Sequence, residues 1–530
     1  MIFSCCSSYW CVAMLFITLS LVLLISMETK SSIWSDLHLP TEHIPFFFNN
    51  NPDIKQLCKE DKSCPYRKIA DVKKCWGYES GCPQSERMKS PICDGDGRGW
   101  VKDKAAQIQK FWTDADFGYV QFFQKQSRKF CSSKEKDGAV LECSGFLRHC
   151  RAKNIFLNFK NADIVNSRNR YREDLFKEGD VGGYCDVYMN ALKAEDGHKS
   201  PLQSWFAELG GYTSLSRDPF KNDDCDIKID KPTYLIKLDA GVNMFHHFCD
   251  FVNLYATLHL NNTFSTDINI VMWDTSAMYY GDFFHDTWKA FTDNPIIHLK
   301  DYDGKKVCFK DAVFSLLARM RFGLYYNMPL IPGCHGSSLM KAFSDHVLHR
   351  MKIKQKGPHK DKIRITLLDR KSAYRNIMNQ NELVSAMKMV GHYDVQVVIY
   401  DRNLPFPKQM EISHNSDIFI GMHGAGLTHV LFQPDWAVLF ELHNCDDKNC
   451  YYDLARLRGV KYMTWEKEDK VQPEDEGHHP TLGAHAKFTN YEFNVEEFMR
   501  LINIAADHVT YHPQFQHARR NKYQNVKTEL

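Results

Sequence analysis

The fold is decided by residues 416–442, which read SDIFIGMHGAGLTHVLFQPDWAVLFEL. The apolar run Ile418–Gly421 predicts a short buried strand, and Ala437–Leu442 predicts a second one. Between them, residues 421–429 are rich in small side chains and lead into an apolar segment. Such a turn directly after a buried strand is typical of a sheet whose strands alternate with helices.

The same alternation extends on both sides of this segment. Strands are predicted over Ile363–Leu368, Val395–Tyr400 and Val460–Trp465. Helices are predicted over residues 382–390 and 495–508. The pattern predicts an α/β fold with a parallel doubly wound sheet, which would bind a ligand at the carboxyl ends of its strands.

The first half of the chain is less regular. Strands are predicted over Tyr234–Leu238 and Ile268–Trp273, and a Lys-rich segment with Gly357 and Pro358 predicts an exposed linker. We therefore expect six parts: an export segment at 1–27, a Cys-rich region at 28–230, a domain at 231–351, a linker at 352–362, a domain at 363–510 and a tail at 511–530.

The two ends of the chain predict its compartment. Residues Met1–Met27 carry no charged side chain, and an apolar run from Trp10 to Ile25 suits a signal peptide, with an uncleaved signal anchor as the alternative. The tail Lys527-Thr528-Glu529-Leu530 differs at one position from the retrieval signal of the endoplasmic reticulum. Together they predict a protein of the endoplasmic reticulum lumen with the retrieval receptor as a partner.

Composition agrees with that compartment. Of the 18 cysteines, 15 follow the export segment. Their irregular spacing indicates disulfide bonds rather than a zinc array. The odd number implies a free thiol, and Cys445 and Cys450 are close enough to close a short loop. Asn261 begins an Asn-Asn-Thr sequon for an N-glycan. The net charge of +2 gives no electrostatic case for binding nucleic acid.

Several side chains follow the predicted strands of the second domain. Backbone N–H groups at Gly424, Ala425 and Gly426 could approach an oxyanion, and a diphosphate is the natural guest; the alternative is a tight turn that needs small residues. Basic side chains after the first strand could pair with phosphate or lie in a solvated loop; they are Arg370, Lys371 and Arg375. His423 lies within the small-residue turn. Glu441 could accept from ribose hydroxyls or be a surface carboxylate.

Two further motifs lie in the first domain. His246 and Asp250 share a helix face after Asn243, and such a pair could act as a general base or be a satisfied core pair. Asp301 and Asp303 have the Asp-x-Asp form that can chelate a divalent metal on a nucleotide sugar. A hairpin turn at the following glycine is the alternative, and local sequence favours it.

These motifs together resemble a known family of inverting glycosyltransferases. The resemblance rests on residues 416–442 and on the segments KLDAGVNMFHHFCDF, KDYDG, LLDRKSAYRN, YYDLARLRGVKYMTW and GHHPTLGAHAKFTNY. The family includes an O-mannose β-1,4-N-acetylglucosaminyltransferase and plant xylan arabinosyl- and xylosyltransferases. The resemblance is strongest to its branch that modifies EGF-like domains in the endoplasmic reticulum.

The resemblance implies a fold and a reaction. The fold would be two Rossmann-like domains facing a cleft (GT-B-like), after a Cys-rich N-terminal region. The reaction would move GlcNAc from UDP-GlcNAc, with inversion, to Ser or Thr hydroxyls of folded EGF-like domains in secreted and membrane proteins such as Notch-type receptors or matrix proteins. Alternatives are another UDP-sugar or acceptor, or a non-catalytic lumenal binding protein.

The resemblance also assigns residues. Asn243, His246 and Asp250 would face the acceptor, with the base open between His246 and Asp250. The nucleotide side would use Arg370, Arg375, His423, Gly424 and Gly426. A divalent metal such as Mn²⁺ at Asp301 and Asp303 is an option that transferases with two Rossmann-like domains usually do not need.

Overall fold

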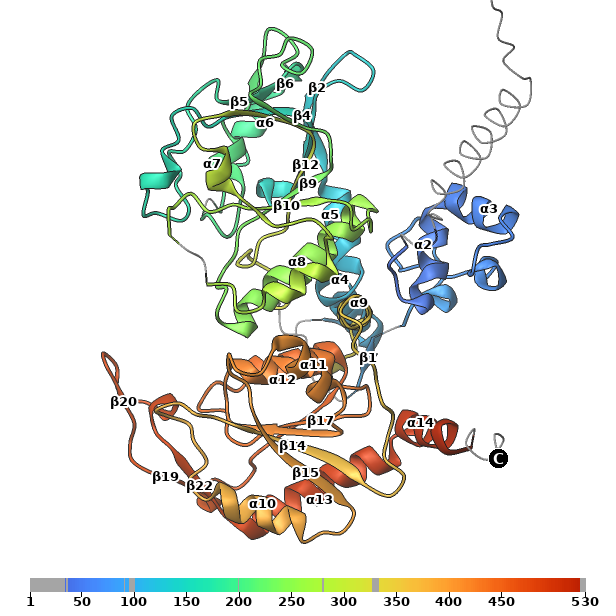
Figure 1. Ribbon diagram of the computed structural model, residues 1–530, viewed down its shortest axis with the longest axis vertical. Helices are drawn as coiled ribbons and strands as arrows, with labels where there is room; N and C mark the ends of the chain where they lie inside the picture. The colour runs from blue at the N-terminus through green and yellow to red at the C-terminus, as the bar shows by residue number, and fades with distance from the viewer. Residues whose placement is uncertain are drawn as a thin grey trace, which may run out of the picture.

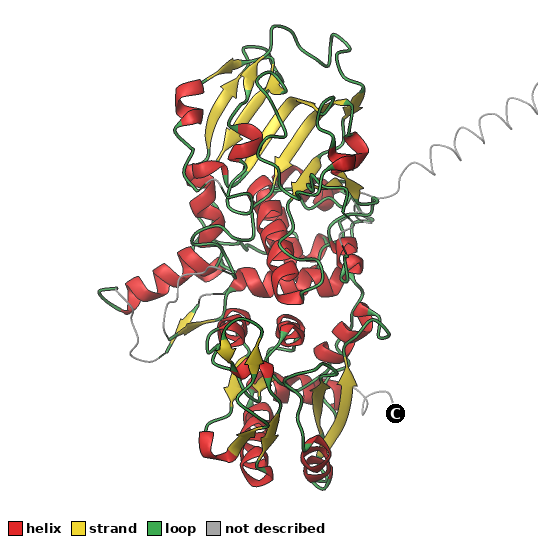
Figure 2. Ribbon diagram, turned by 90° about the vertical axis from the view of Figure 1, so that its left-hand side faces the viewer, coloured by secondary structure: helices red, strands yellow, loops and turns green. Residues whose placement is uncertain are grey.

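The structure is a computed structural model that describes Trp34 and residues 37–89, 91–94, 101–198, 200–278, 281–326 and 333–524. The predicted export segment and the Lys527–Leu530 tail lie outside these residues. Within them, no helix has the length and apolar character that crossing a membrane requires. Two sheets occupy opposite ends of the molecule, with a layer of helices between them (Figure 2).

The C-terminal sheet has five strands, all parallel, in the order β15-β14-β16-β17-β18. Their bounds are β14 Ile363–Asp369, β15 Tyr393–Ile399, β16 Ile418–Gly421, β17 Val438–Glu441 and β18 Lys461–Thr464. Strand β16 shows why the sequence gives this sheet, because Ile418 and Ile420 join the core on one face while Phe419 joins the core on the other. The predicted parallel sheet is confirmed.

Helices cover both faces of that sheet. α10 (Gln380–Lys388) and α13 (Val495–Tyr511) lie below it in Figure 1, and α11 (Phe406–His414) and α12 (Cys450–Arg458) lie above it. Helix α13 continues three residues beyond the predicted His508, and a further helix follows it. The small-residue turn leads into a 3₁₀ helix, η8 (Ala425–Phe432). The doubly wound arrangement is therefore also confirmed.

The N-terminal sheet is mixed and larger. Strand β9 lies between β10 and β12, and β9, β10, β11 and β12 run parallel. Strand β4 pairs antiparallel with β12 and leads to β2, β3, β5, β6 and β7, while β8 pairs parallel with β12. The bounds are β2 Arg128–Ser132, β3 Val140–Cys143, β4 Cys150–Asn158, β5 Val181–Gly183, β6 Asp186–Val187, β7 Thr213–Ser214, β8 Ile227–Ile229, β9 Thr233–Ile236, β10 Asn269–Met272, β11 Ile297–His298 and β12 Lys306–Phe314. This sheet crosses residue 230, so the Cys-rich region and the segment after it build one sheet.

The layer between the sheets is centred on α8 (Met244–Asn261), which follows β9 and is buried along most of its length. Phe248 of α8 packs against Phe432 of η8, with ring centroids 5.5 Å apart. From α9 (Ser338–Arg350), the Ser344 hydroxyl donates to the Leu431 carbonyl of η8. One hydrophobic core thus runs from the N-terminal sheet to the near face of the C-terminal sheet. It fixes the two sheets relative to each other.

Shorter elements complete the chain. The helices are α2 Ile44–Asn50, α3 Pro52–Glu60, α4 Lys104–Ala115, α5 Gly118–Gln126, α6 Met189–Lys193, α7 Phe206–Leu209, α9 Ser338–Arg350 and α14 Pro513–Gln524. The strands are β1 Ile92–Cys93, β13 Cys334–His335, β19 Val471–Pro473, β20 His478–His479, β21 Gly483–Ala484 and β22 Tyr491–Phe493. Residues 352–362 contain neither helix nor strand.

Disulfide bonds hold the N-terminal half, as predicted. The pairs are Cys58–Cys64, Cys75–Cys82, Cys93–Cys334, Cys131–Cys185, Cys143–Cys150 and Cys225–Cys308. Cys249, Cys445 and Cys450 are free thiols. The predicted Cys445–Cys450 loop closure is therefore wrong: closeness in sequence does not bring the two sulfur atoms together, and burial raises the pKa of both thiols to about 12.

Candidate active site

A cavity of about 600 Å³ lies between the two sheets. The start of α8 lines one wall, and the carboxyl ends of the C-terminal strands line the other. Seven of the predicted residues meet here: Asn243, His246, Arg370, Arg375, His423, Gly424 and Ala425. The sheet order explains the position, because β14 and β16 are neighbours whose connections leave in opposite directions, and ligands bind at such points.

The positive charge of this wall comes from two arginines. Arg370 Nη1 and Arg375 Nη1 lie 3.3 and 2.9 Å from the carbonyl oxygen of His423, to which both donate. Among the described residues, neither guanidinium has a carboxylate within ion-pair distance. Burial, with the neighbouring charge of Arg375, lowers the pKa of Arg370 to about 10. Two adjacent, partly desolvated cations without a counter-charge form a site for an anion.

Gly424 makes this arrangement feasible. A Cβ at Gly424 would lie 2.2 Å from Arg370 Nη1 and 3.8 Å from Arg375 Nη1. Any larger residue would therefore push the Arg370 side chain away. Gly426 is needed for a different reason, since a Cβ there would meet the Leu368 side chain at 2.6 Å. Gly426 and Lys371 line a second hollow of about 270 Å³ that shares Arg370 and Gly424 with the main cavity.

His423 is held by a carboxylate behind it. Its Nδ1 lies 2.8 Å from Glu441 Oε1, and the Tyr462 hydroxyl donates to Glu441 Oε2 at 2.6 Å. Glu441 is fully buried and does not line the cavity. Neither sequence interpretation of Glu441 fits this position, because the carboxylate is buried behind His423 and reaches neither the cavity nor the surface. Glu441 instead orients His423.

On the opposite wall, His246 is paired with a residue that the sequence analysis did not select. His246 Nδ1 lies 2.8 Å from Asp239 Oδ2, and Arg319 Nε donates to Asp239 Oδ1 at 2.9 Å. Burial by itself would raise the pKa of Asp239, but the bonds from His246 and Arg319 hold that pKa below its usual range. An ionised Asp239 fixes Nδ1 of His246 as the donor and leaves Nε2 to accept a proton.

Asp250 differs from His246 in every relevant respect. Its side chain is buried, does not line the cavity, and accepts from the backbone N–H of Asp239 at 3.0 Å. Burial raises the pKa of Asp250 well above that of an ordinary carboxyl group. Asp250 therefore braces the turn that carries Asp239. Asn243 caps α8 by accepting from the backbone N–H of Phe245 at 3.1 Å.

The Asp-x-Asp motif lies outside the cavity. Asp301 accepts from the backbone N–H of His298, as a cap of the 3₁₀ helix η7 (Leu299–Tyr302). Asp303 accepts from the backbone N–H of Val165 at 3.0 Å. Both carboxylates therefore have local structural roles, and the cavity that holds the arginine pair does not include them. Asn261, the predicted glycan site, ends α8 with its side-chain amide donating to the Thr257 carbonyl.

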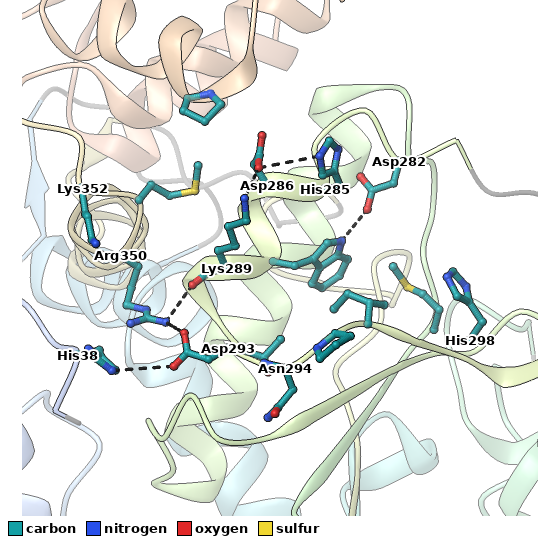
Figure 3. Close-up of a pocket in the computed structure, with 17 residues that line it drawn as sticks. His38, Asp282, His285, Asp286, Lys289, Asp293, Asn294, His298, Arg350 and Lys352 are labelled. Atoms are coloured by element: carbon teal, nitrogen blue, oxygen red, sulfur yellow. Dashed lines mark hydrogen bonds and ion pairs between the residues drawn. The ribbon is translucent and has the colours of Figure 1, made fainter. Parts of the chain in front are cut away.

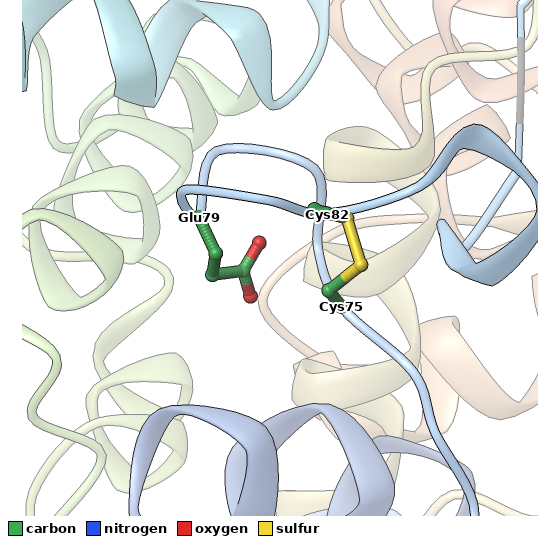
Figure 4. A group of neighbouring side chains, drawn as sticks. All are labelled: Cys75, Glu79 and Cys82. Carbon is green, nitrogen blue, oxygen red and sulfur yellow. A yellow bond between two sulfur atoms is a disulfide. The ribbon is translucent and has the colours of Figure 1, made fainter.

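One other group has the composition of a metal site. Cys75, Glu79 and Cys82 lie together (Figure 4), but the two cysteines form a disulfide and offer no thiolate. The carboxylate of Glu79 accepts from the backbone N–H groups of Trp76 and Gly77. The group is therefore a braced loop, not a metal centre.

A larger hollow of about 1090 Å³ lies elsewhere, beside the end of α9. Figure 3 shows several of its charged side chains paired with one another. Arg350 pairs with Asp293 at 2.8 Å, and Lys289 pairs with Asp286 at 2.6 Å. Its lining includes none of the predicted site residues. Among its described residues, it also has no two adjacent cations that lack a carboxylate partner, as Arg370 and Arg375 do. We therefore place the chemistry in the smaller cavity between the sheets.

The residues of the cavity region that the sequence analysis did not select include four charged side chains. Asp239 and Arg319 support His246, while Asp447 lies 3.0 Å from Lys487 and 3.7 Å from His423 Nε2. Asp239 directly follows the strand predicted over Tyr234–Leu238. Its position at the carboxyl end of that strand could have marked it as a candidate site residue. Arg319 reaches the site from a turn and Lys487 from a short 3₁₀ helix, η10 (Ala486–Phe488), both distant in sequence, and no local pattern marks them.

Comparison with known proteins agrees with this site. The family model described as Glycosyltransferase 61 matches residues 245–440, which include His246, Arg370 and the small-residue turn. Relatives that are 54–56% identical over about nine tenths of the chain agree with this match. The chain therefore belongs to the glycosyltransferase 61 family.

Relatives from several animals carry the name EGF domain-specific O-linked N-acetylglucosamine transferase. The chain is 56% identical to the one from Rattus norvegicus, over 91% of this chain and 92% of the relative. It is 54% identical to the one from Gallus gallus, over 92% and 93%. It is 44% identical to the one from Drosophila melanogaster, over 93% and 94%. The similarity thus covers nearly the whole chain.

Proposed function

We propose that this chain transfers GlcNAc from UDP-GlcNAc to Ser or Thr hydroxyls of folded EGF-like domains, with inversion at the sugar. The names of the full-length relatives support the sugar and the acceptor class. The observation in the site that carries the proposal is the unneutralised pair of Arg370 and Arg375 beside Gly424. A diphosphate is the ligand whose charge and size match that pair.

The donor would lie with its diphosphate against this wall. Arg370 and Arg375 would each donate to phosphate oxygens, and the first N–H groups of η8 would add partial positive charge. These groups would stabilise the negative charge that grows on UDP as the bond to the sugar breaks. A cavity of about 600 Å³ is within the usual range for a ligand of this size.

The acceptor would enter from the α8 wall. His246 would take the proton from the attacking Ser or Thr hydroxyl at Nε2, with Asp239 stabilising the cation that forms. The hydroxyl would attack C1 of the sugar from the side opposite UDP, because His246 and the arginine pair line opposite walls of the cavity. A single displacement from the opposite side inverts the anomeric carbon.

We further propose that the molecule is GT-B-like, with two Rossmann-like units facing the cleft. Support comes from strand order: β11-β10-β9-β12 in one sheet and β15-β14-β16-β17-β18 in the other each reverse direction beside the cavity. The units would follow the expected parts, 28–351 for the acceptor side, 352–362 as linker and 363–510 for the donor, before the 511–530 tail.

No metal is needed in this proposal. The residues present do not fit a divalent cation at Asp301 and Asp303, since both carboxylates accept backbone N–H groups outside the cavity. The arginine pair supplies the positive charge instead. Export by residues 1–27 and retrieval through Lys527–Leu530 would keep the enzyme in the endoplasmic reticulum lumen, where folded acceptor domains pass.

A transfer assay tests the proposal. Secreted protein from residue 28 onward is incubated with a folded EGF-like domain and a panel of UDP-sugars, with and without EDTA. We expect a mass gain of one N-acetylhexosamine with UDP-GlcNAc alone, unaffected by EDTA. A matched reduced and alkylated domain should gain little mass. Gain from a different UDP-sugar, or no gain with any donor, would refute the proposed reaction.

A further inference from the structure

A shallow hollow of about 380 Å³ lies beside the cleft, on the acceptor side. We call it the Phe322 ledge and define it by its lining residues, which are His198, Gln203, Arg319, Arg321 and Phe322. None of them is acidic. Phe322 is 58% exposed, and the guanidinium of Arg321 lies 5.0 Å from the centre of its ring.

The Phe322 ledge is continuous with the proposed catalytic pair. Arg319, which lines it, donates to Asp239 and also lies 5.3 Å from the centre of the Tyr326 ring. Tyr326 in turn lines the cleft, with its ring 5.3 Å from that of His246. Anything bound on the ledge is therefore separated from His246 by the Arg319 and Tyr326 side chains.

The surface carries positive charge without compensation. Among the described residues, Arg321 forms no ion pair. Arg148 is buried close by, its Nε has no hydrogen-bond partner, and burial together with the charge of Arg321 lowers the pKa of Arg148. Holding like charges together costs stability, and such an arrangement persists where a negatively charged partner offsets that cost.

Backbone strain is concentrated at the same place. Phe322 has a φ of 57° and His198 a φ of 53°, in the left-handed region that bulky residues rarely adopt. Phe146, with a φ of 58°, is 37% exposed and contacts the His198 ring. Strain of this kind is retained at functional surfaces, and here it keeps two aromatic rings turned toward solvent.

We propose that the Phe322 ledge docks an acidic face of the folded acceptor domain during transfer. The inference rests on the proposed function, which supplies the class of partner. Exposed aromatic rings beside arginines are the side chains that contribute most to protein interfaces. A docking surface outside the catalytic pair would let the enzyme select a folded domain rather than a short unstructured segment.

Two variants test this inference. Arg321→Glu reverses the charge, and Phe322→Asn removes the ring while keeping a residue that tolerates the left-handed backbone. Arg519→Glu is the matched control, because Arg519 also stacks on a phenylalanine, Phe515, but on helix α14. We measure KM for the folded EGF-like domain, UDP-GlcNAc hydrolysis without acceptor, and direct binding of the domain by calorimetry.

We expect Arg321→Glu and Phe322→Asn to raise KM for the domain, and its Kd, at least about tenfold, with hydrolysis of UDP-GlcNAc unchanged. The salt dependence of binding should flatten in Arg321→Glu. Wild-type KM and Kd in both variants would overturn the inference while leaving the proposed function intact. Failure of the wild-type protein to transfer any sugar would instead refute the proposed function, and calorimetry would still report on the ledge. Loss of hydrolysis in the variants would place the ledge in the donor site and also overturn the inference.

Discussion

Replacing Gly424 by alanine should separate donor binding from folding. The new Cβ would lie 2.2 Å from Arg370 Nη1, and ordinary contact begins at 3.4 Å, so the guanidinium must retreat by about 1.2 Å. Arg370 is a flexible side chain, so it can move without disturbing the sheet. The backbone at Gly424 has a φ of 159°, which residues other than glycine rarely adopt, so we also expect a modest fall in the melting temperature of a protein that still folds.

The same shift should weaken UDP binding. Losing one hydrogen bond to a charged group costs about 1.5–3 kcal/mol, which is roughly a 10- to 140-fold rise in Kd. Isothermal titration calorimetry with UDP measures it. Gly391→Ala is the control, because a Cβ at Gly391 meets no atom within 4 Å. Wild-type affinity for UDP in a folded Gly424→Ala protein would show that Arg370 does not hold the diphosphate.

Three further predictions follow from the site and the core. Asp239→Asn should lower kcat by about 10²- to 10⁴-fold, because His246 loses its orienting carboxylate, while UDP affinity measured by calorimetry stays the same; an unchanged kcat would exclude His246 as the oriented base. Asp303→Ala should lower the free energy of unfolding by about 0.5–1.5 kcal/mol in a urea titration, through the lost bond to Val165, and leave kcat and its insensitivity to EDTA unaltered. A metal-dependent loss of turnover in that variant would restore the Asp-x-Asp motif to the reaction. Acid should destabilise the protein between about pH 6.5 and 3, because burial lowers the pKa of several histidines to about 3. In that window the unfolded chain binds more protons than the folded one, so the free energy of unfolding falls as the pH falls. At pH 5 each of these histidines lowers the free energy of unfolding by up to about 2 kcal/mol. Equal free energies of unfolding in urea titrations at pH 7 and pH 5 would refute this account. The histidines are His43, His247, His346 and His429.

The C-terminal sheet could be predicted because its strands are buried on both faces. Such strands appear in sequence as short continuous apolar runs, and the turns between them carry glycine. The antiparallel part of the N-terminal sheet gives no such signal. Many of its strands are two to five residues long, and β4 pairs with β12 across about 150 residues of chain. Pairing at that separation depends on the finished core rather than on local sequence.

The site shows the same division between local and distant information. Residues that follow strands of the parallel sheet were found, since the carboxyl ends of neighbouring strands must meet. Pairing within a helix was misleading, because His246 and Asp250 lie at helical spacing yet His246 turns to Asp239, which precedes the helix. Glu441 was correctly placed at a strand end, but sequence could not show that His423 and Tyr462 occupy it.

The cavity is lined by the starts of α8 and η8, which carry the two halves of the proposed reaction. His246 lies in the first turn of α8 and Ala425 begins η8, and these two helices pack against each other through Phe248 and Phe432. The proposed base and the proposed diphosphate site are therefore held by one core rather than by two independent domains. Since an error of about 1 Å in reacting geometry can cost about 10²-fold in rate, a shared core preserves alignment that a flexible hinge would lose. In this proposal, a large folded acceptor would be selected by the open surface beside the cleft rather than by closure of the two sheets around it.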